Sequence, residues 1–237
     1  MKIALISDLH ANLPALDAVL AEAAVEGVDR IVCLGDVVDL GPQPAEVVDR
    51  LRELECPIVR GNHDPLEVEP PVLAELHRWS VDALGDARLE HLRGLPSSVR
   101  VELSGGRSML CVHGSPRSDT EGILASSSPE EIAAAVAGVS FDVLACGHTH
   151  LQLVRRIGRR TIVNVGSVGM PFERPFEGAP PRLFPWAEYG LVHCDDRGVV
   201  SVELRRTTYD FEAFEAAVHR SGMPDPDAWL AQWWMES

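Results

Sequence analysis

The sequence predicts an α/β fold, a four-layer α/β/β/α sandwich in which two mixed β-sheets are flanked by helices. Two features of the 237 residues predict it. In the first third of the chain, short apolar runs alternate with segments of helical periodicity, which is typical of parallel strands joined by crossover helices. In the second half, strand-like runs follow one another closely with glycines between them, which indicates antiparallel hairpins. We expect one domain spanning residues 1–237, long enough to bury a full core.

The first half of the chain holds three rounds of strand, polar loop and helix. The first helix has the clearest start, because Asn12-Leu13-Pro14 combines a capping side chain with an early proline. In order, the elements expected here are a strand over 3–8, a helix from Asn12 to Gly27, a strand over 31–34, a helix over 45–54, a strand over 57–60 and a helical segment over 66–96.

The second half is richer in strands. They are expected over residues 98–103, 107–112, 141–146, 151–157, 160–165, 189–194 and 199–206. Residues 171–187 contain five prolines and little periodicity, which predicts a long surface loop. The terminal segment 210–234 is expected to be helical, and its Trp229, Trp233 and Trp234 are expected to fill a core edge or a subunit contact.

The composition excludes several classes of protein. A formal net charge of −15 argues against a basic surface for general nucleic-acid binding. No run of about 18 apolar residues occurs, so no membrane span is expected. The first apolar run leads straight into Ser7-Asp8 and lacks the features of a secretion signal. The five cysteines are odd in number and lie mostly in apolar settings, which indicates reduced thiols and a cytoplasmic location.

Five short polar segments each follow a predicted strand. They are Asp8-Leu9-His10, Gly35-Asp36-Val37-Val38-Asp39, Gly61-Asn62-His63-Asp64, Val112-His113-Gly114 and Gly147-His148-Thr149-His150. Ligand-binding groups gather at the carboxyl ends of the strands of a parallel sheet, so these segments are expected to meet there. Residues i and i+2 of an extended strand end point the same way, which predicts that Asp8 and His10 face one site. His148 and His150 repeat that arrangement.

The polar segments supply two carboxylates, four imidazoles and one carboxamide as ligands, and leave one histidine and one aspartate over for chemistry. That set suits a pair of divalent metal ions at the carboxyl ends of the strands. Nitrogen and oxygen ligands without thiolate suit Mn²⁺, Fe, Zn²⁺, Co²⁺ or Ni²⁺, and manganese is the expected ion. Mg²⁺ and Ca²⁺ bind imidazole-rich sites poorly. The remaining histidines, His77, His91, His193 and His219, are expected to be ordinary structural side chains.

Together the segments match D-x-H, G-D-x-x-D, G-N-H-[DE], H and G-H-x-H, the signature of the calcineurin-like metallophosphoesterase family, which the chain resembles over residues 8–150. The stretch from Asn164 to Gly169 is similar to an N-x-G-S-x-G element of the small bacterial phosphodiesterase branch. The resemblance implies two metal sites that share Asp36. One would use Asp8, His10, Asp36 and His150, and the other Asp36, Asn62, His113 and His148.

The resemblance also implies roles in catalysis. A hydroxide that bridges the two metals would attack phosphorus in line. His63 would protonate the leaving oxygen or stabilise its charge, and Asp39 would hold the other ring nitrogen and fix the tautomer. Asp64 is given no role beyond the turn. Arg60, Arg117 and Ser167 lie near the expected site, where each could contact substrate or serve only as a solvated or turn-stabilising side chain.

The function expected from the resemblance is a metal-dependent phosphodiesterase acting on a small phosphate ester or a cyclic nucleotide. One alternative is a protein Ser/Thr phosphatase or dinucleoside polyphosphatase, but those branches carry an arginine where this chain has Leu40. A second alternative is a non-catalytic scaffold of the same fold, which tends to lose the histidine retained here as His63. The partner expected is a small substrate, and a homo-oligomer is left open.

Overall fold

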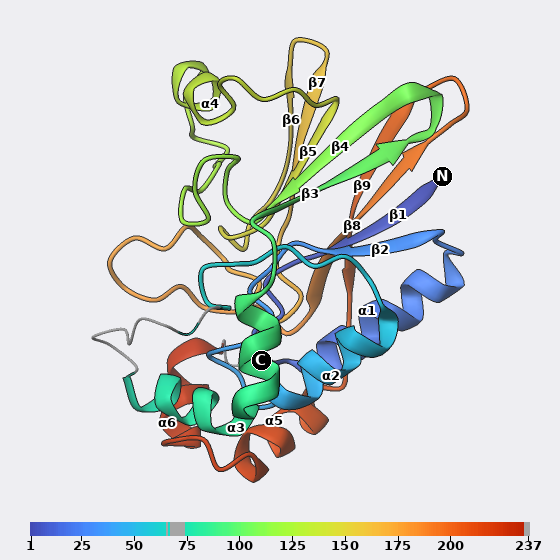
Figure 1. Cartoon of the computed structure of the whole chain (residues 1–237). Helices are drawn as coiled ribbons and strands as arrows, with labels where there is room; N and C mark the ends of the chain where they lie inside the picture. The colour runs from blue at the N-terminus through green and yellow to red at the C-terminus, as the bar shows by residue number, and fades with distance from the viewer. Residues whose placement is uncertain (65, 67–73, 235–237) are drawn as a thin grey trace.

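The computed structural model describes residues 1–64, 66 and 74–234, and these residues build two mixed β-sheets packed face to face with helices outside them (Figure 1). The predicted four-layer fold is therefore confirmed. One sheet has the order β2 (Arg30–Cys33), β1 (Lys2–Ile6), β8 (Ala187–Cys194), β9 (Val200–Thr207). The other has the order β3 (Ser98–Leu103), β4 (Arg107–Val112), β5 (Val143–Cys146), β7 (Arg160–Val165), β6 (Gln152–Ile157).

The helices lie outside the two sheets and at one end of them (Figure 1). They are α1 (Leu13–Val25), α2 (Pro44–Leu54), α3 (Ala74–Arg93), α4 (Pro129–Ala135), α5 (Phe211–Arg220) and α6 (Pro226–Trp233). α1 and α2 cover the outer face of the four-stranded sheet, and α4 covers that of the five-stranded sheet. α5 and α6 pack together beside α1.

The central strands β1 and β5 bury apolar side chains on both faces, because a second layer covers each side of them. In β1, Ile3 and Leu5 point into the space between the sheets, whereas Ala4 and Ile6 point toward the helices. This alternation follows from the two-residue period of a strand. It also explains why β1 is a continuous apolar run, which is typical of a central strand.

Helix α4 was not predicted, although its start carries a clear local signal. Ser128 and Glu131 form a capping box in which each side chain accepts from the other residue's backbone N–H, and Pro129 occupies the first turn. Ile132 and Val136 then pack against the outer face of the five-stranded sheet. The helix has only seven residues, too few for a clear amphipathic period.

The strand predicted over residues 57–60 is wrong in extent. Only an isolated parallel bridge joins Ile58 to Cys33. Cys33 N donates to Pro57 O at 2.9 Å and Val59 N to Cys33 O at 2.9 Å, after which Arg60 N turns away to the carbonyl of Pro96. Proline has no N–H to extend the ladder, so the pairing stays this short.

Two long segments also differ from expectation. The segment predicted as helical over 66–96 contains α3, which a left-handed Gly85 (φ 68°) interrupts, while residues 65 and 67–73 lie outside the described residues. The predicted surface loop 171–187 is partly buried, since Leu183 is inaccessible and its N–H donates to Trp233 O at 2.7 Å. The terminal segment is two helices. Its three tryptophans are buried, which confirms that they pack a core edge.

The described residues contain no helix with the length and apolar character needed to cross a membrane. The five cysteines are all free thiols, and four of them are buried. Burial raises the pKa of Cys111 to about 12 and that of Cys146 to about 12, so these thiols remain protonated and unreactive.

Candidate metal centre

The candidate ligands lie in loops that follow strands of both sheets. Asp8 and His10 follow β1, Asp36 follows β2, Asn62 follows the Ile58 bridge, His113 follows β4, and His148 and His150 follow β5. Since β1 and β2 belong to one sheet and β4 and β5 to the other, the loops meet where the two sheets end together. This confirms that the polar segments gather at the carboxyl ends of the strands.

The backbone brings these side chains together in a different way from the predicted one. Asp8 (φ 53°), His10 (φ 43°), His148 (φ 66°) and His150 (φ 57°) adopt left-handed conformations beyond the strand ends. Strand alternation is therefore the wrong basis for the geometry. Asp8 and His10 do reach one group of ligands, whereas His148 and His150 reach two adjoining groups. Left-handed conformations of non-glycine residues cost about 1–3 kcal/mol each and persist where the surrounding structure enforces them.

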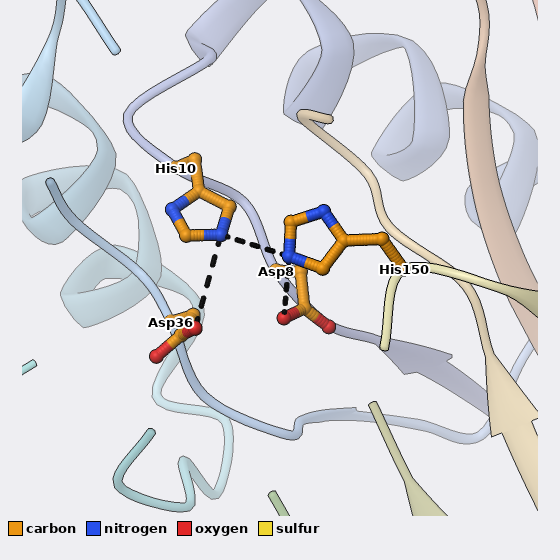
Figure 2. Close-up of side chains that lie close together, drawn as sticks. All are labelled: Asp8, His10, Asp36 and His150. Carbon is orange, nitrogen blue, oxygen red and sulfur yellow. Dashed lines mark hydrogen bonds and ion pairs between the residues drawn. The ribbon is translucent and has the colours of Figure 1, made fainter. Parts of the chain in front are cut away.

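The first group of candidate ligands is Asp8, His10, Asp36 and His150 (Figure 2). The Nε2 atoms of His10 and His150 lie 3.2 Å apart. His150 Nε2 is also 3.2 Å from Asp8 Oδ1, and His10 Nε2 is 3.8 Å from Asp36 Oδ2. All four side chains are buried, so four donor atoms converge on one point away from bulk water.

The second group shares Asp36 with the first and adds His113 and His148. His113 Nε2 lies 3.2 Å from Asp36 Oδ2. The carboxamide oxygen of Asn62 sits between the two histidines, 3.1 Å from His113 Nε2 and 2.9 Å from His148 Nδ1. The geometry thus reproduces two overlapping groups of four, with Asp36 common to both.

The donor atoms fit divalent metal ions. Asp8 Oδ1 is buried and makes no hydrogen bond within the described residues, although two imidazole nitrogens lie near it. His113 Nδ1 lies 2.8 Å from Leu34 O and His150 Nδ1 lies 2.6 Å from Met170 O. A backbone carbonyl therefore takes the outer N–H of each ring, which leaves Nε2 to face the centre, as in metal-ligating histidines.

Charge in the centre is balanced by protons when no metal is bound. Burial and the neighbouring His150 lower the pKa of His10 to about 3, so its ring is neutral and carries a lone pair. Burial opposes ionisation of Asp8, but His150 and His113 outweigh it and hold the pKa at about 2. Burial also lowers the pKa of His113, but Asp36 and Asp8 reverse this and raise it to about 10.

We expect metal binding to release protons. The folded state raises the pKa of His113 from the ordinary 6.5 to about 10. Because this pKa lies above pH 7–8, His113 of the metal-free protein is protonated in that range. A cation can use Nε2 only after displacing that proton, so affinity should rise by up to about tenfold per pH unit below pH 10. Calorimetric titration with Mn²⁺ in buffers of different ionisation enthalpy measures the proton count. An affinity that does not depend on pH between 6.5 and 8.5 would contradict this expectation.

His63 stands beside the two groups and is paired with Asp39. Its Nδ1 lies 3.0 Å from Asp39 Oδ2. Burial lowers the pKa of His63, whereas Asp36 and Asp39 raise it to about 9. The same Asp39 carboxylate meets His77 Nδ1 at 3.4 Å and accepts from Ser80 Oγ at 3.4 Å. Helix α3 supplies both of these residues, and no local pattern ties them to a site 38 or more positions upstream.

Asp64 joins two loops of the site, which is more than the turn role expected from the sequence. It is fully buried, and its carboxylate accepts the backbone N–H groups of Asp36 at 3.0 Å, Val37 at 2.7 Å and Gly61 at 2.7 Å. Burial raises the pKa of Asp64 to about 6, against the effect of these donors. The side chain thereby ties the loop of Asp36 to the loop of Asn62.

Replacing Asp64 with alanine is expected to destabilise the protein strongly. Three buried N–H groups would lose their acceptor, and an unpaired buried donor costs about 1–3 kcal/mol. We expect the free energy of unfolding to fall by about 3–5 kcal/mol, measured by urea denaturation of the metal-free protein. Asp142→Ala is the control, because Asp142 accepts one backbone N–H, from Ser108, pairs with Arg107 and is 31% exposed. Equal losses in the two variants would contradict the assignment.

Three residues left open by the sequence are now placed. Ser167 Oγ donates to Asp8 O at 2.7 Å and accepts from Met170 N at 2.7 Å, which favours a turn-stabilising role. Arg117 Nε donates to Glu121 Oε2 at 2.7 Å in an exposed position. Arg117 and Arg60 both lie outside the lining of the cavity beside the centre.

The chain was compared with families of known proteins. Residues 1–179 match the model of the calcineurin-like phosphoesterase superfamily domain. Phosphodiesterase YfcE of Escherichia coli K12 is 31% identical over 212 residues, which cover 85% of this chain and 92% of that protein. Protein MJ0912 of Methanocaldococcus jannaschii is 25% identical over 243 residues, which cover 97% of this chain and 96% of that protein.

Solved structures share the fold. The crystal structure of a metallophosphoesterase from Sphaerobacter thermophilus superposes with a TM-score of 0.75 at 29% identity, covering 98% of this chain and 99% of that one. The similarity extends over nearly the full length of both chains, including the parts beyond residue 179 that the family model does not reach.

Proposed function

The chain belongs to the calcineurin-like phosphoesterase superfamily, and on that premise we propose that it is a metal-dependent phosphodiesterase acting on a small phosphate ester. The observation that carries the proposal is the pair of ligand groups that share Asp36, with His63 beside them and in neither group. Similarity to a protein named phosphodiesterase over most of the chain supports the same reading.

In this proposal Asp8, His10, Asp36 and His150 hold one divalent ion, and Asp36, Asn62, His113 and His148 hold a second. The ions supply Lewis acidity when bound, which lowers the pKa of water and neutralises phosphoryl oxygens. The chain's own part is to orient the rings through their outer nitrogens and to exclude bulk water by burial.

His63 is proposed to act on the leaving group. Its Nδ1 is held by Asp39, so Nε2 is left to meet the substrate, and the side chain is 32% exposed and lines the cavity beside the centre. A histidine with a proton on Nε2 can deliver it to the departing oxygen as the ester bond breaks. Asp39, His77 and Ser80 would keep the ring in the orientation that this transfer needs.

The direct test pairs metal analysis with turnover. We expect the purified protein to bind about two transition-metal ions per chain and to hydrolyse bis-p-nitrophenyl phosphate faster when Mn²⁺ is added. p-Nitrophenyl phosphate, a monoester, should be the poorer substrate. A folded protein that takes up no metal, or one that takes it up and hydrolyses neither ester, would overturn the proposal.

A further inference from the structure

A cavity of about 550 Å³ opens directly over the candidate metal centre. His10, Asp36, Asn62, His63, His148 and His150 form its floor. Its outer wall is mostly apolar, and its largest side chains are Leu40, Leu124, Phe172, Phe176 and Trp233. Among the described residues that line the cavity, none is an arginine or a lysine. All the ionisable groups of the lining therefore belong to the floor.

The wall contains a set of aromatic rings that starts at the centre itself. Phe172 stacks on His150 with centroids 4.1 Å apart and an interplanar angle of 23°. The Trp233 ring lies nearly parallel to that of Phe172, with centroids 6.5 Å apart and an interplanar angle of 6°, and the Phe176 centroid also lies 6.5 Å from that of Phe172. Phe176 is 56% exposed, so a ligand in the cavity can cover an aromatic face that water now contacts.

Two arginines outside the cavity lining tie together the backbone segments that carry this wall. The guanidinium of Arg174 donates to the carbonyls of Pro175, Ala179 and Pro180, which closes the loop that carries Phe176. The guanidinium of Arg182 donates to the carbonyls of Ala231 and Gln232 at the end of α6 and to that of Trp234, which follows the helix. Backbone oxygens thus occupy both cations, and Arg174 also pairs with Glu173, its Nε lying 3.6 Å from Glu173 Oε1. The cavity lining beside them carries no cation among the described residues.

We propose that this wall binds a planar, uncharged aromatic group of the substrate, so that the substrate is a monoanionic phosphodiester with an aryl or nucleobase-bearing ester group. The inference rests on the proposed function and specifies its substrate class. The single charge of a diester is met by the floor. The further charges of a polyphosphate chain would meet no cation on the wall, whereas a flat ring finds aromatic faces to stack on.

The test keeps the leaving group constant and varies the other ester group. Methyl, phenyl and thymidine 5′ esters of p-nitrophenyl phosphate all release p-nitrophenolate, so differences in kcat/KM report on the remaining group. We expect the phenyl or the thymidine ester to exceed the methyl ester by about tenfold or more. Which of the two is higher distinguishes an aryl from a nucleotide source. The ratio should fall toward one in Phe176→Ser and stay unchanged in Val25→Ser, an equally apolar change at a residue 90% exposed at the end of α1.

A second readout needs no turnover. Saturation-transfer NMR of diphenyl phosphate with the metal-free protein should show contact at the phenyl protons in the wild type and in Val25→Ser, and less in Phe176→Ser. Equal kcat/KM for the three esters, with no saturation transfer to the phenyl protons, overturns the inference about the wall. The proposed phosphodiesterase function is not affected by that result. A preference that survives Phe176→Ser overturns the assignment to this wall. Failure to hydrolyse any of the three esters with metal bound overturns the proposed function and the substrate class with it.

Discussion

Asp36→Asn is expected to abolish phosphodiesterase activity and to reduce the bound metal from about two ions per chain to fewer than one. Asp36 is the one residue common to both ligand groups, and its pKa is held well below the ordinary value because the nearby histidines outweigh the effect of burial. An amide of the same shape keeps the acceptor for His63 N but supplies no charge. We expect kcat/KM to fall by roughly 10³-fold or more, equivalent to about 4 kcal/mol of barrier.

The control for this variant is Asp49→Asn. Asp49 is also a carboxylate in an ion pair, with Arg88, but that pair joins α2 to α3 at the surface. Its removal should leave metal content and turnover within twofold of wild type. Metal content is measured on protein dialysed against limiting Mn²⁺, beside urea denaturation to show that both variants fold. An Asp36→Asn protein that retains two ions and full turnover would exclude Asp36 as a shared ligand.

The fold could be predicted because its signals are local. Alternating apolar runs and glycine-bounded hairpins identify strands, and the polar segments mark their carboxyl ends. The predictions for residues 57–60 and 171–187 are wrong because contacts with distant parts of the chain decide the structure there. Pro57 stops the pairing at Ile58, and Leu183 is buried because Trp233, far along the chain, covers it. No periodicity over residues 171–187 contains that information.

The members of the candidate site were predictable, but their geometry was not. Motif spacing selects Asp8 and His10, whereas the left-handed backbone that aims them depends on contacts with other loops, such as His10 N donating to Asp36 O at 3.1 Å. Asp64 looks like an ordinary turn residue in the sequence. Its role appears only when the N–H groups of Asp36 and Val37, 27 or more positions away, are seen on its carboxylate.

A non-catalytic scaffold of this fold is the second of the two alternatives that the sequence leaves open. A non-catalytic protein has no use for an oriented proton donor. In this chain the loop after β2 supplies Asp39, and α3 supplies His77 and Ser80 to the same carboxylate. Two further side chains on the carboxylate that partners His63 form a buried polar network, and such a network fixes the orientation of the His63 ring.

His63→Ala is therefore expected to lower kcat on diesters by about 10²–10⁴-fold while leaving metal content unchanged. His63 belongs to neither ligand group, so the ions should remain. His219→Ala is the control, because His219 is a surface histidine that also pairs with a carboxylate, that of Asp227, at 2.9 Å. Metal content and kcat of both variants are measured with Mn²⁺ saturating.

The choice of leaving group separates proton donation from positioning. p-Nitrophenolate departs with little help from an acid, whereas phenolate is far more basic and needs the proton. Loss of a general acid should therefore slow diphenyl phosphate by at least about tenfold more than bis-p-nitrophenyl phosphate. Equal slowing of both esters would mean that His63 orients the substrate instead of protonating it. A His63→Ala protein with wild-type turnover would contradict the role given to His63 and would mean that another group protonates the leaving oxygen.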